Sequence, residues 1–235
     1  MEKNLSINSL LDTTKTIAAE IFNEKIYPWE ILPYISSFIK KLGTVLPKKK
    51  YILYKKDVWI ANNAKICSNA TIVGPAIIDA DSEIRNCAHI RKNVIIGKNC
   101  VIGNSTEIKN SILFDEVQAP HFNYIGDSIL GFKAHLGAGA ILSNVKSDKS
   151  AIAIKSKENI STELRKFGSI IADFVEIGCN SVINPGVIVS RYSNVYPLSS
   201  VRGVVPKERI FKGQNNIVKK YKKISNKFKI DGQVF

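Results

Sequence analysis

An isoleucine recurs at every sixth position along one stretch of this chain, without an omission. An amphipathic helix repeats its apolar positions every three or four residues and a half-buried strand every two, so an interval of six fits neither. This hexapeptide repeat predicts a mainly β fold, a parallel β-helix in which three hexads complete a triangular coil of about 18 residues. The series comprises Ile60, Ile66, Ile72, Ile78, Ile84, Ile90, Ile96, Ile102 and Ile108.

A second, mostly smaller residue follows each of these isoleucines four positions later. Each hexad is therefore expected to direct one large and one smaller side chain into the core. Adjacent coils should stack at roughly 4.8 Å, the spacing of neighbouring strands. These second residues are Ala64, Ala70, Ala76, Ser82, Ala88, Val94, Cys100, Thr106 and Ile112.

The repeat is absent from residues 1–50, which favour a helical segment instead. Asp12 or Thr13 can cap a first helix that reaches about residue 23. Pro28 can open a second helix with one apolar stripe, and Gly43 is expected to end it.

Residues 51–206 are predicted to form the β-helix domain, with about six coils. The ladder is interrupted after Ile112 and resumes at Leu130. Residues 143–168 lose the period again and are expected to form a long loop, which is usually functional or disordered. Residues 207–235 are rich in lysine and are expected to form a helix or a loose basic tail.

The chain carries a formal net charge of +14 over its 235 residues. This excess favours acidic ligands such as phosphorylated metabolites, although a lysine-rich composition without a specific ligand explains it equally well. We expect neither a nucleic-acid partner nor a membrane. No stretch approaches 18 consecutive apolar residues, and the first residues lack the apolar core of a secretory signal, so a cytoplasmic protein is expected.

The cysteines also favour a cytoplasmic protein, because none of them forms a CxxC pair. One occupies an inward position of the repeat, and all are expected to be reduced thiols. They are Cys67, Cys87, Cys100 and Cys179.

Residues 18 positions apart are expected to stack on the same face of the β-helix. Arg91 should then lie beneath Lys109, and with no obvious carboxylate nearby the two cations favour a phosphate site, with two solvated charges as the alternative. His89 should lie beneath Glu107, which is compatible either with an acid–base pair or with a simple surface ion pair.

The interruption of the ladder contains His121. An imidazole outside the regular coil walls is a candidate catalytic group, because loops can aim side chains more freely. The sequence Gly137-Ala138-Gly139 brings the backbone close to the surface, which suits an N–H donor to an oxyanion, although a tight corner explains it equally well.

Residues 57–206 resemble a known enzyme domain. The motifs are Ile102-Gly103-Asn104, Glu107-Ile108-Lys109, His121, Tyr124-Ile125-Gly126-Asp127, Leu136-Gly137-Ala138-Gly139, Arg165-Lys166-Phe167-Gly168 and Asn184-Pro185-Gly186. They resemble the acetyltransferase domain of the bifunctional N-acetylglucosamine-1-phosphate uridyltransferase / glucosamine-1-phosphate acetyltransferase family. The resemblance implies a left-handed β-helix acyltransferase domain, a homotrimer, and acetyl-CoA bound between neighbouring subunits.

The resemblance also assigns roles to individual residues. Its catalytic group contains His121 as general base, Glu107 as the neighbouring carboxylate and Asn144. Its substrate group contains Arg91, Lys109 and Tyr124, and its cofactor group contains Ala138, as oxyanion donor, with Gly139 and Cys179.

Three positions depart from the family pattern. His135 stands where the family usually has Asn, Gly168 where some members have Lys, and Cys179 where a Ser contacts the cofactor. The uridyltransferase half has no counterpart, because residues 1–50 are too short for a nucleotide-binding fold and contain no glycine-rich phosphate loop.

The leading hypothesis is an acetyl-CoA-dependent N-acetyltransferase of an amino-sugar phosphate similar to glucosamine 1-phosphate, which would serve UDP-N-acetylglucosamine biosynthesis. No metal is expected. One alternative is a non-catalytic β-helix scaffold that partners a sugar nucleotidyltransferase through residues 1–50. Another is a zinc hydratase resembling the trimeric β-helix carbonic anhydrases, although His89, His121 and His135 do not reproduce that family's spacing.

Overall fold

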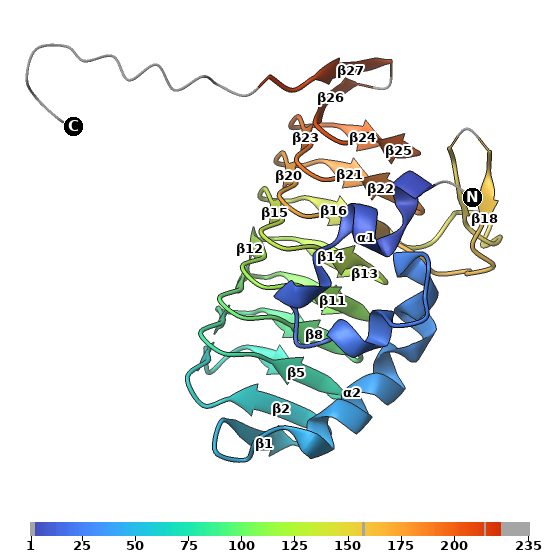
Figure 1. Cartoon of the computed structure of the whole chain (residues 1–235). Helices are drawn as coiled ribbons and strands as arrows, with labels where there is room; N and C mark the ends of the chain where they lie inside the picture. Colours follow the sequence, from blue (N-terminus) through green and yellow to red (C-terminus); the bar gives the residue numbers. More distant parts are fainter. Residues whose placement is uncertain (1–2, 157, 214, 222–235) are drawn as a thin grey trace, which may run out of the picture.

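The computed structural model describes residues 3–156, 158–213 and 215–221. Short strands wind around a common axis and form three parallel sheets, which confirms the predicted β-helix (Figure 1). Sheet A contains β1 (Tyr51–Lys55), β2 (Val58–Ala61), β5 (Ala76–Ile78), β8 (Val94–Ile96), β11 (Ser111–Leu113), β14 (Ile129–Leu130), β19 (Ser169–Ile171), β22 (Val187–Val189) and β25 (Val204–Val205).

The other two sheets follow in each coil in the order A, B, C. Sheet B contains β3 (Lys65–Ile66), β6 (Glu83–Ile84), β9 (Val101–Asn104), β12 (Gln118–His121), β15 (His135–Leu136), β20 (Glu176–Ile177), β23 (Asn194–Val195), β26 (Arg209–Gly213) and β27 (Asn216–Lys219). Sheet C contains β4 (Thr71–Ile72), β7 (His89–Ile90), β10 (Glu107–Lys109), β13 (Tyr124–Gly126), β16 (Ile141–Leu142), β21 (Val182–Ile183) and β24 (Ser200–Val201).

The isoleucine ladder forms the core because its members pair in register from coil to coil. Ile78 pairs with Ile96 in sheet A, and Ile90 pairs with Ile108 in sheet C. These four side chains have no exposed surface, and the smaller inward residue Cys100 is equally buried. The inward positions predicted from the six-residue period are therefore correct as far as Ile108. Ile112 was also predicted to point inward, but it pairs with Ile95, and Ser111 takes the inward place opposite Val94 because the chain is one residue shorter there.

The predicted number of coils was too low. Sheet A contains a ladder of parallel strands from β2 to β25, which gives about eight turns rather than six. The apparent interruption around Ile112 consists of two successive coils that are each one residue short, because Ile108 pairs with Ile125 instead of Gly126 and Ile125 pairs with Leu142 instead of Ser143. His121 consequently ends the regular strand β12, opposite Asn104, and the prediction that it lies in an irregular loop was wrong.

The N-terminal segment is less helical than expected. It contains η1 (Lys3–Leu5), α1 (Ile7–Leu10), η2 (Thr13–Lys15), η3 (Ala19–Phe22), η4 (Pro28–Tyr34) and α2 (Ile35–Val45). The predicted helix from about 13 to 23 is wrong, since β-branched residues disfavour a continuous helix there. Pro33 lies within η4, where a ring without an N–H opposes α-helical hydrogen bonding until α2 begins.

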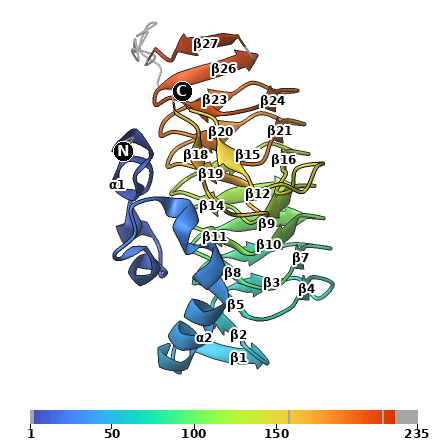
Figure 2. The ribbon, with the colours of Figure 1, turned by 90° about the vertical axis from the view of Figure 1, so that its right-hand side faces the viewer.

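Gly43 was expected to end the second helix, but α2 continues through it to Val45. A Cβ at Gly43 would overlap the indole of Trp59, so this glycine allows the helix to approach the solenoid closely. Helix α2 contacts β5 and β8, and the segment lies along the outer face of sheet A (Figures 1 and 2). Its residues Ile35 and Ile39 are fully buried there.

Residues 143–168 leave the solenoid between β16 and β19, and they carry a short antiparallel hairpin of β17 (Ala153–Ile154) and β18 (Ile160–Ser161). The side chains of Ile152 and Ile154 are buried, so the insertion packs against the rest of the chain.

Antiparallel strands finish both ends of the solenoid. Strand β1 pairs with β2, and β26 pairs with β27. The helix or loose tail predicted from residue 207 is therefore wrong as far as residue 219, and the remainder of that prediction, residues 222–235, lies outside the described residues. No helix in the described ranges has both the length and the apolar character needed to cross a membrane.

The buried ladder predicts the main source of stability. We expect Ile108→Ala to lower the free energy of unfolding by about 2–5 kcal/mol, because the neighbouring coils cannot close the cavity that it leaves. Val182→Ala is the control, since Val182 lies on sheet C with 38% of its surface exposed. Denaturant unfolding measures both variants, and equal losses would show that the ladder is not the stabilising core.

Candidate functional site

Four of the predicted site residues lie along the corner at which the chain passes from sheet B to sheet C. The N–H of Gly139 donates to the carbonyl of His121 at 3.0 Å, and the N–H of Asn180 donates to the carbonyl of Ala138 at 2.8 Å. His121, Ala138 and Cys179 thus occupy equivalent places in successive coils, with Gly139 beside Ala138. The stacking brings these residues together although the insertion separates them in sequence.

The backbone turns this corner in the left-handed conformation in the coils that carry these residues. Phe122, Gly139 and Asn180 have φ values of 51°, 72° and 54°. A Cβ at Gly139 would overlap the terminal amide oxygen of Asn180, so a side chain here would require Asn180 to move.

The corner presents groups that can act on a ligand. The side chains of His121 and Cys179 are exposed. The N–H of Ala138 makes no hydrogen bond within residues 3–156, 158–213 and 215–221, whereas the N–H groups of Gly137 and Gly139 are both engaged. An exposed imidazole therefore lies one coil below an available backbone donor.

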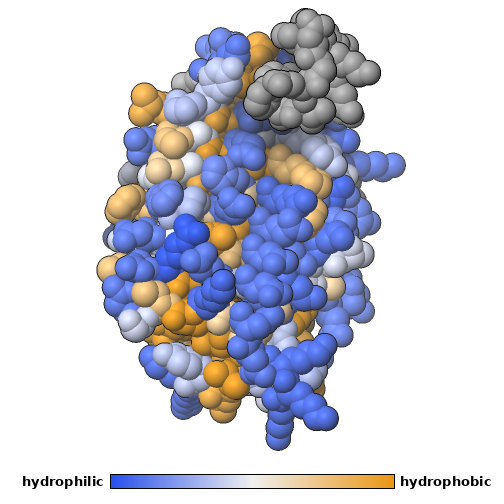
Figure 3. Space-filling model, turned by 90° about the vertical axis from the view of Figure 1, so that its left-hand side faces the viewer, coloured by the Kyte–Doolittle hydropathy of each residue, from blue (hydrophilic) through white to orange (hydrophobic). Residues whose placement is uncertain are grey.

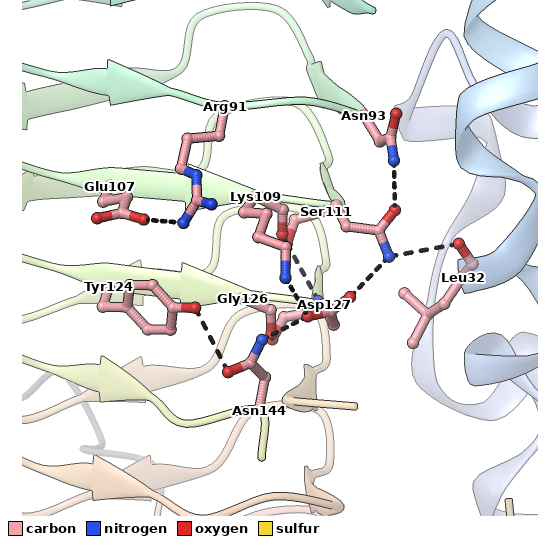
Figure 4. Close-up of polar contacts among 12 residues, drawn as sticks. Leu32, Arg91, Asn93, Glu107, Lys109, Ser111, Tyr124, Gly126, Asp127 and Asn144 are labelled. Atoms are coloured by element: carbon pink, nitrogen blue, oxygen red, sulfur yellow. Dashed lines mark hydrogen bonds and ion pairs between the residues drawn. The ribbon is translucent and has the colours of Figure 1, made fainter. Parts of the chain in front are cut away.

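The second group of predicted residues lies on sheet C. Glu107 pairs in register with His89 below it and Tyr124 above it, as the stacking argument predicted for His89. Its carboxylate, however, accepts a hydrogen bond from Arg91 Nη1 at 2.7 Å (Figure 4). Among the described residues, no hydrogen bond joins Glu107 to His121 or to His89.

The expectation that Arg91 and Lys109 lack a carboxylate was wrong. Arg91 is paired with Glu107, and Lys109 Nζ lies 3.3 Å from Asp127 Oδ2. The repeat determines which face of the β-helix a residue lies on, but it does not determine where a long side chain extends. In both pairs the two residues belong to neighbouring coils.

Asp127 is the site residue that the sequence argument did not single out, although it ends the Tyr124-Ile125-Gly126-Asp127 motif. Its carboxylate accepts from Asn110 Nδ2 at 2.8 Å, from Lys109 and from Asn144 Nδ2. Asn144 Oδ1 in turn accepts from the Tyr124 hydroxyl at 3.4 Å (Figure 4). The network joins Lys109, Asn144 and Tyr124 through one buried carboxylate.

Tyr124 is a hydrogen-bond donor in this network. Burial raises the pKa of its phenol above the ordinary value, and the negative charges of Asp127 and Glu107 raise it further. The hydroxyl therefore stays protonated at neutral pH.

The structure shows the contacts of two residues that depart from the family pattern, His135 and Gly168. His135 lies on sheet B, where its Nδ1 is 2.7 Å from Glu176 Oε2. Gly168 donates its N–H to the carbonyl of Asp127, and a Cβ there would overlap the carbonyl oxygen of Gly126. A side chain at 168 would therefore disturb the strand that carries Tyr124.

Within the described ranges, no three His, Cys, Asp or Glu side chains lie close enough together to hold a metal ion. The three histidines occupy different positions, with His89 on sheet C, His121 at the corner and His135 on sheet B.

The fold and the motif residues define an acetyltransferase-like domain of the hexapeptide-repeat class. Residues 72–195 match the family described as the GMPPB C-terminal domain, and the chain belongs to that family. The resemblance drawn from the sequence motifs is confirmed at this level.

Two curated relatives have names that describe bifunctional proteins. The chain is 33% identical over 105 residues to the bifunctional sugar-1-phosphate nucleotidylyltransferase/acetyltransferase of Sulfurisphaera tokodaii, covering 44% of this chain and 26% of that protein. It is 32% identical over 113 residues to the bifunctional protein GlmU of Methanococcus vannielii, covering 48% of this chain and 27% of that protein. The aligned region thus spans about a quarter of each relative.

Solved structures of similar shape include the acetyltransferase domain of PglB from Neisseria gonorrhoeae in complex with acetyl coenzyme A. It has a TM-score of 0.27 and 12% identity, covering 78% of this chain and 63% of that one. A GDP-perosamine N-acetyltransferase mutant from Caulobacter crescentus, in complex with CoA and GDP-perosamine, has a TM-score of 0.30 and 15% identity, covering 70% of this chain and 57% of that one.

Proposed function

We propose that this protein transfers an acetyl group from acetyl-CoA to the amine of an amino-sugar phosphate similar to glucosamine 1-phosphate. The observation that supports the proposal best is the pairing of an exposed His121 imidazole with the available N–H of Ala138 in the next coil. The acetyltransferase names of the relatives support the same chemistry.

The reaction needs a base and an oxyanion donor. As the amine nitrogen attacks the thioester carbonyl, a C–N bond forms and His121 accepts the proton that the nitrogen loses. The Ala138 N–H stabilises the negative charge on the carbonyl oxygen. The C–S bond then breaks, and the proton passes to the departing thiolate of coenzyme A. The two residues lie in neighbouring coils that are joined by backbone hydrogen bonds, so their relative positions are fixed before the substrates bind.

The sugar phosphate is assigned to sheet C. Arg91 uses one nitrogen for Glu107 and keeps its remaining donors for a phosphate, with 44% of its side chain exposed. Lys109 adds a second cation nearby. Asn144 and Tyr124 then orient the sugar and its amine.

The homotrimer is part of this proposal. Sheet A is covered by the N-terminal segment, whereas Phe122 and Leu198 are 60% and 81% exposed at the corner that carries His121. A neighbouring subunit at this corner would cover those apolar side chains and complete a groove for acetyl-CoA. In Figure 1, β12 and β23 lie on the left-hand side of the molecule. Figure 3 faces this side and shows a mostly hydrophilic surface with small apolar patches.

Docking of a nucleotidyltransferase through residues 1–50 stays a prediction. The buried residues Ile35 and Ile39 of this segment already pack on the chain's own solenoid, so a partner would have to use its outer surface.

The first test concerns the base. With the best phosphorylated amino sugar found in a screen that measures the released thiol, His121→Ala should lower kcat by roughly 10²–10⁴-fold. Trimer and fold should persist, because the side chain is exposed. His135→Ala is the matched control, since it removes another accessible imidazole without touching the corner. A smaller loss for His121→Ala than for His135→Ala would reassign the base.

The phosphate assignment predicts a selective loss of affinity. Arg91→Ala and Lys109→Ala should each weaken binding of the phosphorylated sugar by roughly tenfold or more, because each removes a charged hydrogen-bond donor. Binding of the unphosphorylated sugar and of acetyl-CoA should change little. Calorimetric titration compares the three ligands, and equal losses for both sugars would show that these cations do not bind the phosphate.

The cofactor assignment can be tested by thiol modification of the native protein. Desulfo-coenzyme A, which has no thiol, should slow iodoacetamide alkylation of Cys179. Cys87 is the control, because it is also exposed and lies at the same corner several coils away. Cys100 should not react in either case, since burial raises the pKa of its thiol to about 12. Mass spectrometry identifies the sites, and equal protection of Cys87 and Cys179 would contradict the assignment.

A further inference from the structure

The carboxylate of Asp127 connects Lys109 and Asn144, two residues of the proposed site that make no hydrogen bond to each other in the part of the chain that the structure describes. Asp127 is only 5% exposed at the corner between sheets C and A. Its Oδ2 lies 3.3 Å from Lys109 Nζ and also accepts from Asn144 Nδ2, while its Oδ1 accepts from Asn110 Nδ2 at 2.8 Å. A buried carboxylate requires such donors, because an unpaired charge away from water is costly.

We infer that Asp127 is a positioning residue for the proposed acetyl transfer, which orients the amide of Asn144 and locates the ammonium group of Lys109. The inference rests on the proposed function. It adds to that function a residue that touches neither the sugar nor acetyl-CoA and acts through the two side chains that do.

The orientation of Asn144 follows from hydrogen-bond chemistry. An ionised carboxylate can only accept hydrogen bonds, so Asn144 must turn its NH₂ group toward Asp127. Its Oδ1 then faces Tyr124, which donates its hydroxyl. An amide oxygen has a second lone pair, and this acceptor can hold an N–H of the substrate amine while His121 removes the other proton.

Lys109 is held by the same oxygen. Its side chain is 23% exposed, against 6% for that of Asp127. Because a lysine has four flexible methylene groups, pairing with a buried carboxylate restricts its ammonium group to one place on sheet C. A phosphate can therefore meet this cation without first ordering it.

Asn110 also links the same carboxylate to the N-terminal segment through hydrogen bonds. Asn110 Nδ2 lies 3.4 Å from the carbonyl oxygen of Leu32, and Asn110 Oδ1 accepts from Asn93 at 3.3 Å (Figure 4). The segment, Asn110 and Asp127 form one continuous network on the side of the site that faces away from the proposed cofactor.

The test compares two buried carboxylates. Asp127→Asn removes the charge and half of the acceptor capacity, and we expect kcat to fall by roughly tenfold or more and KM for the sugar phosphate to rise. KM for acetyl-CoA should not change. Asp173→Asn is the matched control, because Asp173 is 1% exposed and pairs with Arg191 at 2.8 Å, but lies at the corner between sheets A and B. It should lose stability without the catalytic defect.

A double-mutant cycle separates positioning from a general structural role. In an Asn144→Ala background, Asp127→Asn should reduce kcat by less than twofold, because the amide that it orients is already absent, whereas KM for the sugar phosphate should still rise because Lys109 loses its partner. A loss of the same size in both backgrounds overturns the inference.

A measurement on the wild-type protein does not depend on folding of the variants. The NH₂ signal of Asn144, identified by its loss in Asn144→Ala, should exchange slowly with D₂O compared with that of the exposed Asn8. Equally rapid exchange overturns the inference.

The two levels of the argument fail differently. A wild-type protein that acetylates no amino-sugar phosphate overturns the proposed function, and the inference falls with it. An active wild-type protein in which Asp127→Asn loses no more activity than Asp173→Asn overturns the inference alone.

Discussion

Parallel backbone hydrogen bonds between successive coils fix the positions of the residues in the solenoid strands from β2 to β26, apart from the hairpin of the insertion. The inward isoleucines pair in register across these bonds, so one slip would move apolar side chains to the surface in all three sheets. The constraint explains why a coil that is one residue short leaves the core intact. Ile108 pairs with Ile125, the inward alternation is kept, and the missing residue is absorbed at the corner. The same register holds the side chains of the candidate site in fixed positions, although most of the strands are only two or three residues long.

The site depends on register more than on sequence distance. Cys179 lies beyond the 143–168 insertion, yet it occupies the place above Ala138 that an uninterrupted repeat would have given it. The insertion leaves and returns at the C–A corner, where the N–H of Phe167 donates to the carbonyl of Asn144 at 3.1 Å. Asn144 therefore closes the base of the insertion with its backbone and joins the Asp127 network with its side chain. A single residue links the added segment to the polar face of sheet C.

The regular part of this arrangement could be predicted because the period encodes it directly. Nine isoleucines at one spacing specify the fold and its inward positions, and the stacking of His89 beneath Glu107 follows from the same arithmetic. The six-residue period does not determine the direction in which a long side chain extends, so the Arg91–Glu107 ion pair could not be predicted from it. It also fails where a coil loses a residue, as at His121, and where no repeat exists. The 3₁₀ turns before α2 depend on Pro33 and on packing against sheet A, which local propensity does not reveal.

The two ion pairs on sheet C differ in burial, and this difference suggests the order in which a phosphate would engage them. Arg91 and Glu107 have side chains that are 44% and 35% exposed, so their attraction is weakened by water and salt. The guanidinium group can turn from Glu107 toward a ligand at little cost and offer two parallel donors. Lys109 cannot leave Asp127 as easily, because that carboxylate is almost buried and would lose a charged partner. Under the proposed function, a phosphate would therefore be captured first by Arg91 and would then share Lys109 with Asp127. In this arrangement Arg91 would exchange Glu107 for the phosphate. Lys109 would stay paired with Asp127, and the sugar would be aligned against it.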